Sequence, residues 1–469
     1  MTYPIRCHFP ICSMVATTFR LITLAEAAAA HAIEVASYPE DEAASLEQIQ
    51  SRIQQANDYF LGAYDDKNQL LGFVNGTLTA KRDLEEDTMS CHDPNGKFLC
   101  IHSVVVSQAY RKQGIAKKLL KAYVARVVDK GVVSAILLIA KPYLVHFYIS
   151  CGFTVTRLSP VVHGKDAWME LVLDCAEARQ LNVVVVDAFA SRPFEGNPAA
   201  VVVMSVGAFN APGVEKWMQS VAIERNLSET AFVAPLSEDH IGGNEYRLRW
   251  FTPGCEIELC GHATLATAHT LYEDGHCEKY APIHFHTLSG VLTTRYVLLD
   301  DNKTSAIEMD FPKVDKKDHD EAWLTSSKAA LVKALDITPA DIIAVEHYGP
   351  SYICHVTPSA YEAIHPNFSL ISTLACQSVI VTCQAAADSK YDFVSRFFGP
   401  NVGVNEDPVT GSAHCALVPY WHHYLPSSPV NFTARQTSAR GGDLRLRLDG
   451  SRVFLTGTAV VTLRGKMLD

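Results

Sequence analysis

Several features that would assign this chain to a familiar class are missing from its 469 residues. The 13 cysteines form no C-x-x-C pair, no H-E-x-x-H run occurs, and neither a G-x-G-x-x-G fingerprint nor a Walker loop is present. The longest apolar runs, such as 132–140, are far below the roughly 20 residues that span a bilayer. We therefore expect no metal, no nicotinamide or ATP site and no transmembrane helix.

Positive charge is also scarce. The chain has 40 basic and 51 acidic residues, a net charge of −11, which disfavours nucleic acids and anionic membranes as partners. The first fifteen residues hold one base, Arg6, and are broken by Pro4 and Pro10, unlike a signal peptide. Unpaired thiols suit a reducing compartment. We expect a cytoplasmic protein with small-molecule substrates, and a homodimer as the default assembly.

The length suggests about three structural units. Residues 1–16 have the character of a loose tail, and strand and helix patterns alternate from Phe19 to about residue 173. The segment 81–97 is polar and acidic, which is typical of a loop. The polar stretch 174–180 predicts a linker, because a β-branched strand begins directly after it at Leu181. The predicted domains are 17–175 and 181–469, the second with lobes of about 181–300 and 301–469.

A weak internal repeat lies in the second domain. The run E-L-C-G-H-A around Gly261 is matched by P-V-T-G-S-A around Gly411, and each stands where an extended segment ends and an apolar helix begins. Glycine lets a backbone approach a ligand closely, and the N–H groups at a helix start attract anions. If the two turns face each other, they form one anion-binding cleft.

In the first domain, a basic glycine-containing loop stands between an apolar strand, 98–106, and an amphipathic helix. Such a loop can turn consecutive N–H groups toward a pyrophosphate. Together with the later F-Y-I-S-C-G-F run at 147–153, it resembles the GCN5-related N-acetyltransferases (GNAT), and the segment Y-P-E-D-E-A at 38–43 resembles their arylalkylamine N-acetyltransferase branch. The resemblance implies a mixed sheet with flanking helices that binds acetyl-CoA through Val104, Val106, Arg111, Lys112, Gln113, Gly114, Ile115 and Ala116.

An acetyl transfer to an amine needs a base for the amine and an acid for the departing thiolate. The resemblance implies two histidines at positions 100 and 102, on one face of a strand. Here the first is Cys100, so His102 is the one imidazole candidate, and Tyr148 matches the family's acid. Alternatively, Tyr148 is an aromatic residue that only packs in the core. The acidic stretch 83–87 is either a solvated surface or a segment that attracts a cationic amine.

A second set of motifs runs through most of 181–469. It comprises D-A-F at 187–189, F-E-G-N-P-A-A-V at 194–201, N-L-S-E-T-A-F at 226–232, R-W-F-T-P at 249–253, C-G-H-A-T at 260–264 and E-D-P-V-T-G-S-A-H at 406–414. This set resembles the PhzF family of phenazine-biosynthesis-like proteins. The resemblance implies an α/β fold of the diaminopimelate epimerase type, in which each of two lobes wraps a sheet around a central helix and the site lies between the lobes.

The same resemblance implies cofactor-free proton transfer on a small carboxylated metabolite. Glu229 matches the family's general acid/base, and burial beside Leu227 and Phe232 should raise its pKa. Donors at the two helix starts would stabilise an enolate-like charge. The substrate would be held by His262, Gly261, Asp407, Gly411 and Ser412.

The leading hypothesis is thus a bifunctional enzyme, an amine N-acetyltransferase fused to a PhzF-like isomerase whose substrates the sequence does not identify. One alternative is that only the second domain is catalytic and the first is a binding or oligomerisation module. Another is a cofactor-independent epimerase with two opposed cysteines. Thr410 stands where the second cysteine would be, and a hydroxyl cannot replace a thiolate at neutral pH, so Cys260 is expected to be a small buried residue.

Overall fold

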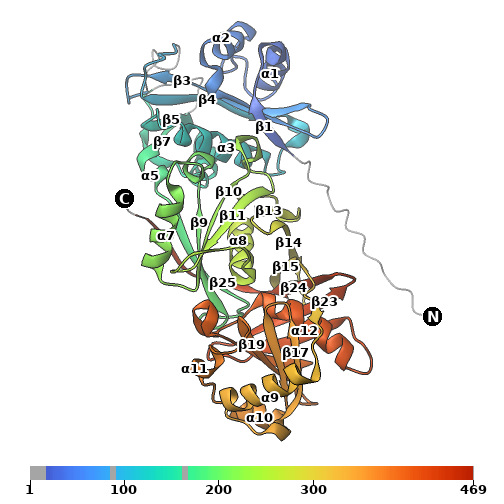
Figure 1. Cartoon of the computed structure of the whole chain (residues 1–469). Coiled ribbons are helices and arrows are strands. Elements are labelled where there is room, and N and C mark those ends of the chain that lie inside the picture. The colour runs from blue at the N-terminus through green and yellow to red at the C-terminus, as the bar shows by residue number, and fades with distance from the viewer. Residues whose placement is uncertain (1–16, 85–90, 161–166, 468–469) are drawn as a thin grey trace, which may run out of the picture. The chain divides into compact units, whose positions relative to one another are not determined.

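The computed structural model describes residues 17–84, 91–160 and 167–467 (Figure 1). The chain divides into two compact units. The first runs to Gln180 and includes Ser237–Gly243, and the second contains Leu181–Leu236 and the rest from Asn244. Among the described residues, no helix is both long and apolar enough to cross a membrane. The predicted tail, 1–16, lies outside the described residues, as does most of the acidic stretch 83–87.

The first unit is built on one mixed sheet in the order β1-β2-β3-β4-β5-β7-β6, antiparallel except for the pair β4–β5. Its strands are β1 Thr18–Leu21, β2 Phe60–Tyr64, β3 Leu70–Thr79, β4 Phe98–Val106, β5 Ala135–Ala140, β6 Thr154–Leu158 and β7 Met169–Asp174. Its helices are α1 Ala27–Val35, α2 Leu46–Ala56, α3 Ile115–Asp129, α4 Val145–Ile149 and α5 Cys175–Arg179. The stretch 174–180, predicted as a linker, therefore holds a short helix, which Asp174 caps with its carboxylate.

Helices cover both faces of this sheet because alternate strand residues point to opposite sides. On β2, Phe60 packs with α1 and α2, whereas its neighbour Leu61 packs with α3. The apolar face of α3 includes Leu119 and Tyr123, which are fully buried. The predicted strand 98–106 and the helix after the basic loop are both present in the structure.

The pairing of β3 with β4 is interrupted at one point. Asn75 stands opposite Ser103 and Gly76 stands opposite Ile101, so His102 is an extra residue in β4, as in a β-bulge. Bulges re-aim side chains, and here Asn75, His102 and Ser103 come together on the face that α1 and α2 cover.

The second unit contains more strands and two long buried helices. Its helices are α6 Val206–Phe209, α7 Val214–Arg225, α8 Gly261–Glu273, α9 Glu321–Leu335, α10 Pro358–Ala363, α11 Phe368–Ile371 and α12 Gly411–Tyr424. Its strands are β8 Asn182–Ala188, β9 Asn197–Val203, β10 Glu229–Pro235, β11 Glu245–Phe251, β12 Glu256–Ile257, β13 Ile283–Thr287, β14 Gly290–Leu298, β15 Ser305–Pro312, β16 Lys316–Lys317, β17 Ile342–Tyr348, β18 Ser351–Val356, β19 Ser378–Gln384, β20 Phe393–Gly399, β21 Val404–Asp407, β22 Asn431–Gln436, β23 Gly442–Asp449, β24 Arg452–Gly457 and β25 Ala459–Lys466.

The strand pairing of this unit repeats itself. In the first lobe, β8-β9-β10-β11-β13-β14-β15 pair in the sequence antiparallel, parallel, antiparallel, parallel, antiparallel, antiparallel. In the second lobe, β17-β18-β19-β20-β22-β23-β24 pair in the same sequence. The connection β11 to β13 contains α8, and the connection β20 to β22 contains α12, so the weak sequence repeat corresponds to a repeated topology. The pairing of β15 with β24 joins the two sheets.

The two repeated helices are unlike surface helices. All of α8 is buried except His269 and Glu273, and α12 is buried over most of its length. A helix that is apolar on all sides belongs in a core. The threonine side chains of α8 form their hydrogen bonds within the helix, because the hydroxyls of Thr264, Thr267 and Thr270 each donate to the carbonyl four residues earlier.

Candidate functional sites

The N-termini of α8 and α12 meet in the second unit. A Cβ atom built on Gly261 would lie 3.1 Å from the Cα of Gly411, and one built on Gly411 would lie 3.2 Å from the Cα of Gly261. Neither helix start is capped by a side chain. Two sets of helix N-terminal N–H groups, with their partial positive charge, therefore converge on one place.

An acid and an imidazole face each other beside this junction. Glu229 is the first residue of β10 and His262 is the second residue of α8, and their Oε2 and Nε2 atoms are 2.9 Å apart. The side chain of His262 is 5% exposed and that of Glu229 is 13% exposed. The contact places a negative and a positive charge together in a region with little water, where their attraction is strong.

Asn197, the first residue of β9, connects the two lobes at this point. Its Nδ2 donates to Asp407 Oδ1 at 2.8 Å and to the carbonyl of Val409 at 3.0 Å, and it lies 3.2 Å from His262 Nδ1. Its Oδ1 accepts a hydrogen bond from Ser228. The motifs at 194–201 and 226–232 contain Asn197 and Ser228, but neither residue was predicted to belong to the site. An Asn before a Pro is typical of a turn and does not indicate that its side chain connects two lobes.

The protonation of the acids follows from these contacts. The His262 imidazolium lowers the pKa of Glu229 even though burial acts in the opposite direction, so the expected upward shift of this pKa was wrong. The carboxylate of Glu229 raises the pKa of His262 against the effect of burial. Burial raises the pKa of Asp407 to about 6, and the charge of Glu229 adds to the effect. Glu229 is thus ionised in a site where Asp407 titrates near neutrality.

The equivalent positions of the two helix starts carry different residues. Cys260 precedes the first residue of α8 and Thr410 precedes the first residue of α12, and neither side chain bonds to its helix start. The Thr410 hydroxyl donates to Asp407 Oδ2. Burial raises the pKa of the Cys260 thiol, which keeps the thiol neutral. Ser412 occupies in α12 the position that His262 occupies in α8. It is exposed and forms no side-chain hydrogen bond within the described ranges.

Glu229, Cys260 and His262 are also the one group in the described residues whose ligand atoms lie close enough to hold a metal, all within 4.8 Å. Cys260 Sγ lies 3.5 Å from Nδ1 of the imidazole, whereas the carboxylate lies beside Nε2. One imidazole cannot present both nitrogens to a single ion. The three groups therefore form a row, in which the imidazole lies between the thiol and the carboxylate.

In the first unit, the basic loop stands between β4 and α3 as predicted. Gly114 caps α3 with φ +81°, Lys112 has φ +64°, and no side chain caps the helix start. The guanidinium of Arg111 donates to the carbonyl of Val106 and to Ser37 Oγ, each at 2.9 Å. Arg111 therefore fixes the loop against the end of β4. In the same loop, Oε1 of Gln113 is buried without a hydrogen-bond partner.

The predicted acetyl-transfer residues lie in different surroundings. His102 Nε2 is 2.8 Å from Thr77 Oγ1, and burial together with Arg52 lowers the pKa of His102 well below its usual value. Cys100 is fully buried, and burial raises its pKa to about 12. Tyr148 is 7% exposed, its ring lies edge-on to Phe153, and burial raises its pKa, so it is a protonated phenol.

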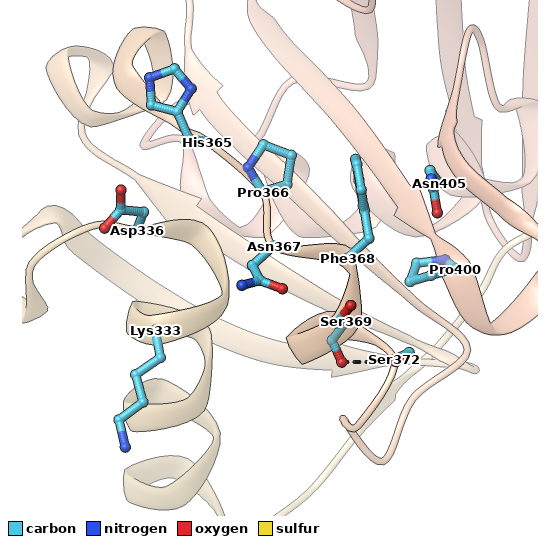
Figure 2. Close-up of a pocket in the computed structure, with 10 residues that line it drawn as sticks. All are labelled: Lys333, Asp336, His365, Pro366, Asn367, Phe368, Ser369, Ser372, Pro400 and Asn405. Carbon is cyan, nitrogen blue, oxygen red and sulfur yellow. Dashed lines mark hydrogen bonds between the residues drawn. The ribbon is translucent and has the colours of Figure 1, made fainter.

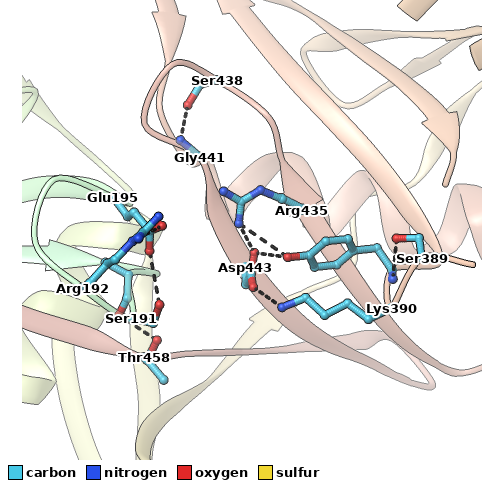
Figure 3. A network of polar contacts seen from close by, with 12 residues as sticks. Ser191, Arg192, Glu195, Ser389, Lys390, Arg435, Ser438, Gly441, Asp443 and Thr458 are labelled. Carbon is cyan, nitrogen blue, oxygen red and sulfur yellow. Dashed lines mark hydrogen bonds and ion pairs between the residues drawn. The ribbon is translucent and has the colours of Figure 1, made fainter. Parts of the chain in front are cut away.

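Two surface hollows of the second unit lie away from these groups. Figure 2 shows one lined by the ends of α9 and α11, with Lys333, Asp336 and His365 on one side and Pro400 and Asn405 on the other. The other, of about 1130 Å³, is lined by strands of both lobes. Its charges are paired with one another, as Figure 3 shows for Asp443, which Arg435 and Lys390 contact.

Comparison with known proteins assigns both units. The family model "Phenazine biosynthesis-like protein" (PhzC-PhzF) matches residues 186–465, and the chain belongs to this family. It is 42% identical to an uncharacterized isomerase of Halalkalibacterium halodurans and 40% identical to one of Pseudomonas aeruginosa, in each case over 61% of this chain and 98% of the relative. A PhzF family protein of Enterococcus faecalis superposes with a TM-score of 0.51 at 34% identity, covering 62% of this chain and 99% of that one.

The model for the acetyltransferase (GNAT) domain matches residues 27–169. The chain therefore contains a GNAT acetyltransferase domain, a class that uses acyl-CoA, followed by a PhzF-like isomerase domain. Both are enzyme families, which confirms the fusion, the mixed α/β fold class and the enzymatic nature predicted from the sequence.

Proposed function

We propose that the second unit isomerises a small carboxylated metabolite by moving a proton with Glu229. The observation that carries this proposal is the contact between Glu229 and His262 at the junction of two uncapped helix starts. A substrate carboxylate bound at these N–H groups would have its adjacent C–H acidified, because the same donors stabilise the developing enolate. The lowered pKa of Glu229 keeps it ionised, so it can accept that proton.

The return of the proton uses the same residues. A substrate anion near the His262 imidazolium offsets the charge that keeps the pKa of Glu229 low, so the protonated form of Glu229 becomes easier to populate. Glu229 then delivers the proton to another carbon of the same substrate. His262 and Asp407 orient the substrate, with Ser412 as the free hydroxyl on the opposite helix. No cofactor takes part in this scheme.

A two-thiol epimerase is the second candidate, and the residues disfavour it. Cys260 is a neutral buried thiol, and Thr410 is engaged with Asp407. A threonine hydroxyl is far too weak an acid to act as the opposing base.

We propose further that the first unit transfers an acetyl group from acetyl-CoA to a primary amine. The loop from Arg111 to Ala116 would bind the pyrophosphate, and Val104 and Val106 the pantetheine arm. The amine nitrogen attacks the thioester carbonyl carbon, the C–S bond breaks, and the amine proton passes to the neutral imidazole of His102. Tyr148 donates its phenolic proton to the departing sulfur, which suits a phenol whose raised pKa keeps it protonated.

One experiment separates these activities. The full-length protein is incubated in heavy water with acetyl-CoA and a panel of amines and carboxylated metabolites, and the products are read by mass spectrometry. Deuterium in a recovered or rearranged metabolite reports the isomerase unit, and an acetylated amine reports the first unit. Glu229→Gln should abolish deuterium incorporation and leave acetylation intact, whereas Glu224→Gln on the exposed face of α7 should change neither. Undiminished exchange in Glu229→Gln would overturn the assignment of Glu229.

The acetyltransferase assignment has its own pair of variants. Tyr148→Phe should slow acetyl transfer while acetyl-CoA still binds, because only the proton donor is lost. Tyr143, 77% exposed, supplies the control Tyr143→Phe, which should transfer at the wild-type rate. An unchanged rate in Tyr148→Phe would show that its ring only packs.

A further inference from the structure

A polar cluster lies on the face of the first unit's sheet that α1 and α2 cover. Glu34 of α1 is 1% exposed, and its Oε1 accepts hydrogen bonds from Ser103 Oγ at 2.8 Å and from the Ala44 N–H at 3.3 Å. Its other carboxylate oxygen, Oε2, is buried and has no hydrogen-bond partner. A buried carboxylate oxygen without a partner is costly, so its surroundings call for a donor from a ligand.

Asn75 adds a second group of this kind. It stands opposite Ser103 in the strand register and is fully buried, yet neither its Oδ1 nor its Nδ2 has a hydrogen-bond partner. Native proteins satisfy nearly all such buried groups. A donor and an acceptor on one side chain, next to a carboxylate oxygen, can receive a ligand that carries both kinds of group.

A cation completes the cluster. Arg52 of α2 is half-buried, and within the described ranges no hydrogen bond or ion pair ties its guanidinium to another side chain. It is close enough to Glu34 and to His102 to influence the pKa of each. Opposite charges are therefore held near each other without being joined, which is the complement of a molecule with an ammonium and a carboxylate.

The cluster stands where the acetyl group would arrive. His102, the proposed base, is next to Ser103 in the chain. Tyr38, four residues after Glu34, lies close to the backbone of Val104, one of the predicted acetyl-CoA contacts. A ligand ammonium at Glu34 would thus lie next to the segment 102–104, where its nitrogen must be for transfer.

We propose that the acceptor of the first unit is an amino-acid-like zwitterion, whose ammonium group binds Glu34 and Asn75 and whose carboxylate binds Arg52. This inference rests on the proposed acetyltransferase function. A simple amine would satisfy Glu34 but leave Arg52 unused. A carboxylated acceptor would also share its chemical class with the substrate proposed for the second unit.

Matched acceptors test the proposal in the full-length protein. Tyrosine with tyramine, and tryptophan with tryptamine, differ only in the carboxylate. With acetyl-CoA, the amino acid of each pair should have the higher kcat/KM. Arg52→Gln should lower the amino-acid to amine ratio of kcat/KM at least tenfold, because a changed pKa of His102 affects both acceptors alike, while Arg52→Lys should restore part of the preference. Glu34→Gln should impair both acceptors, and Glu47→Gln, an exposed carboxylate of α2, should impair neither.

The possible results distinguish a failure of the zwitterion proposal from a failure of the proposed acetyltransferase function. If the amines are acetylated efficiently and Arg52→Gln does not alter the amino-acid to amine ratio of kcat/KM, the zwitterion proposal is wrong. The proposed acetyltransferase function would still hold. If neither class is acetylated, the transfer function fails, and equilibrium dialysis of the same radiolabelled pairs decides the inference. Preferential binding of the amino acids that is lost in Arg52→Gln would support the inference, and its absence would overturn it.

Discussion

Gly261 and Gly411 touch each other across the two lobes, each at the first turn of a buried helix, with only 3.1 to 3.2 Å between one Cα and the place where the other would carry a Cβ. Glycine is required here because a Cβ on either residue would press on the backbone of the opposite helix start. The contact is also what makes a single site out of two repeated halves.

Replacement of Gly411 by alanine should therefore damage both stability and isomerisation. The added methyl would press on the backbone of the opposite helix start, which cannot rotate away as a side chain can. We expect a loss of about 1–3 kcal/mol in the free energy of unfolding of this unit and a strong loss of deuterium exchange. Gly465→Ala is the control, because its Cβ would meet only Leu463 Cδ2, at 3.8 Å. Equal melting curves for the two variants would contradict the expectation.

The pH dependence of the isomerase should change when His262 is replaced by glutamine. The imidazolium keeps the pKa of Glu229 low, and without it burial would raise that pKa. Exchange needs ionised Glu229, so the acid limb of the rate profile should move to higher pH in His262→Gln. The measurement is the rate of deuterium incorporation against pH for both proteins with one substrate. An acid limb at the same pH would show that His262 does not control Glu229.

Asp407 should make the second unit more stable in weak acid. Its pKa is raised to about 6 from an ordinary 3.8, so the folded state binds a proton that the unfolded state has lost between about pH 4 and pH 6. Its contribution is fully present below pH 4 and is lost as the pH rises through 6, an effect of about 3 kcal/mol. Thermal unfolding of wild type and Asp407→Asn across this range isolates the difference. Parallel curves would refute it.

The acetyl-CoA loop can be tested at Gly114. Both Gly114, at the start of α3, and Gly131, after its end, have positive φ and open space where a Cβ would stand. An alanine at either position is strained by about 1–2 kcal/mol, but only Gly114 lies in the predicted pyrophosphate loop. Gly114→Ala should weaken acetyl-CoA binding by roughly tenfold, measured by calorimetry, and Gly131→Ala should leave it unchanged. Equal affinities would remove the loop from the site.

The elements that could be predicted from the sequence are those with a pattern in a short, continuous stretch of residues. The strand 98–106, the basic loop and the glycine turns at 261 and 411 each carry a recognisable pattern of apolar and turn residues. The lowered pKa of Glu229 could not be predicted, because it depends on an imidazole 33 positions along the chain. Asn197 and Glu34 were missed for the same reason, since their partners Asp407 and Ser103 are distant in sequence and only the fold brings them together.

The repeat in strand pairing is exact in order, whereas the residues at its two helix starts are not equivalent. Cys260 and His262 stand on one side, and Thr410 and Ser412 on the other. A cleft with two identical halves would bind a molecule equally well in two opposite directions. This cleft has an imidazole on one helix start and a hydroxyl on the other. In the proposed reaction a metabolite would therefore have one preferred direction, and the proton moved by Glu229 would have a defined origin and a defined destination.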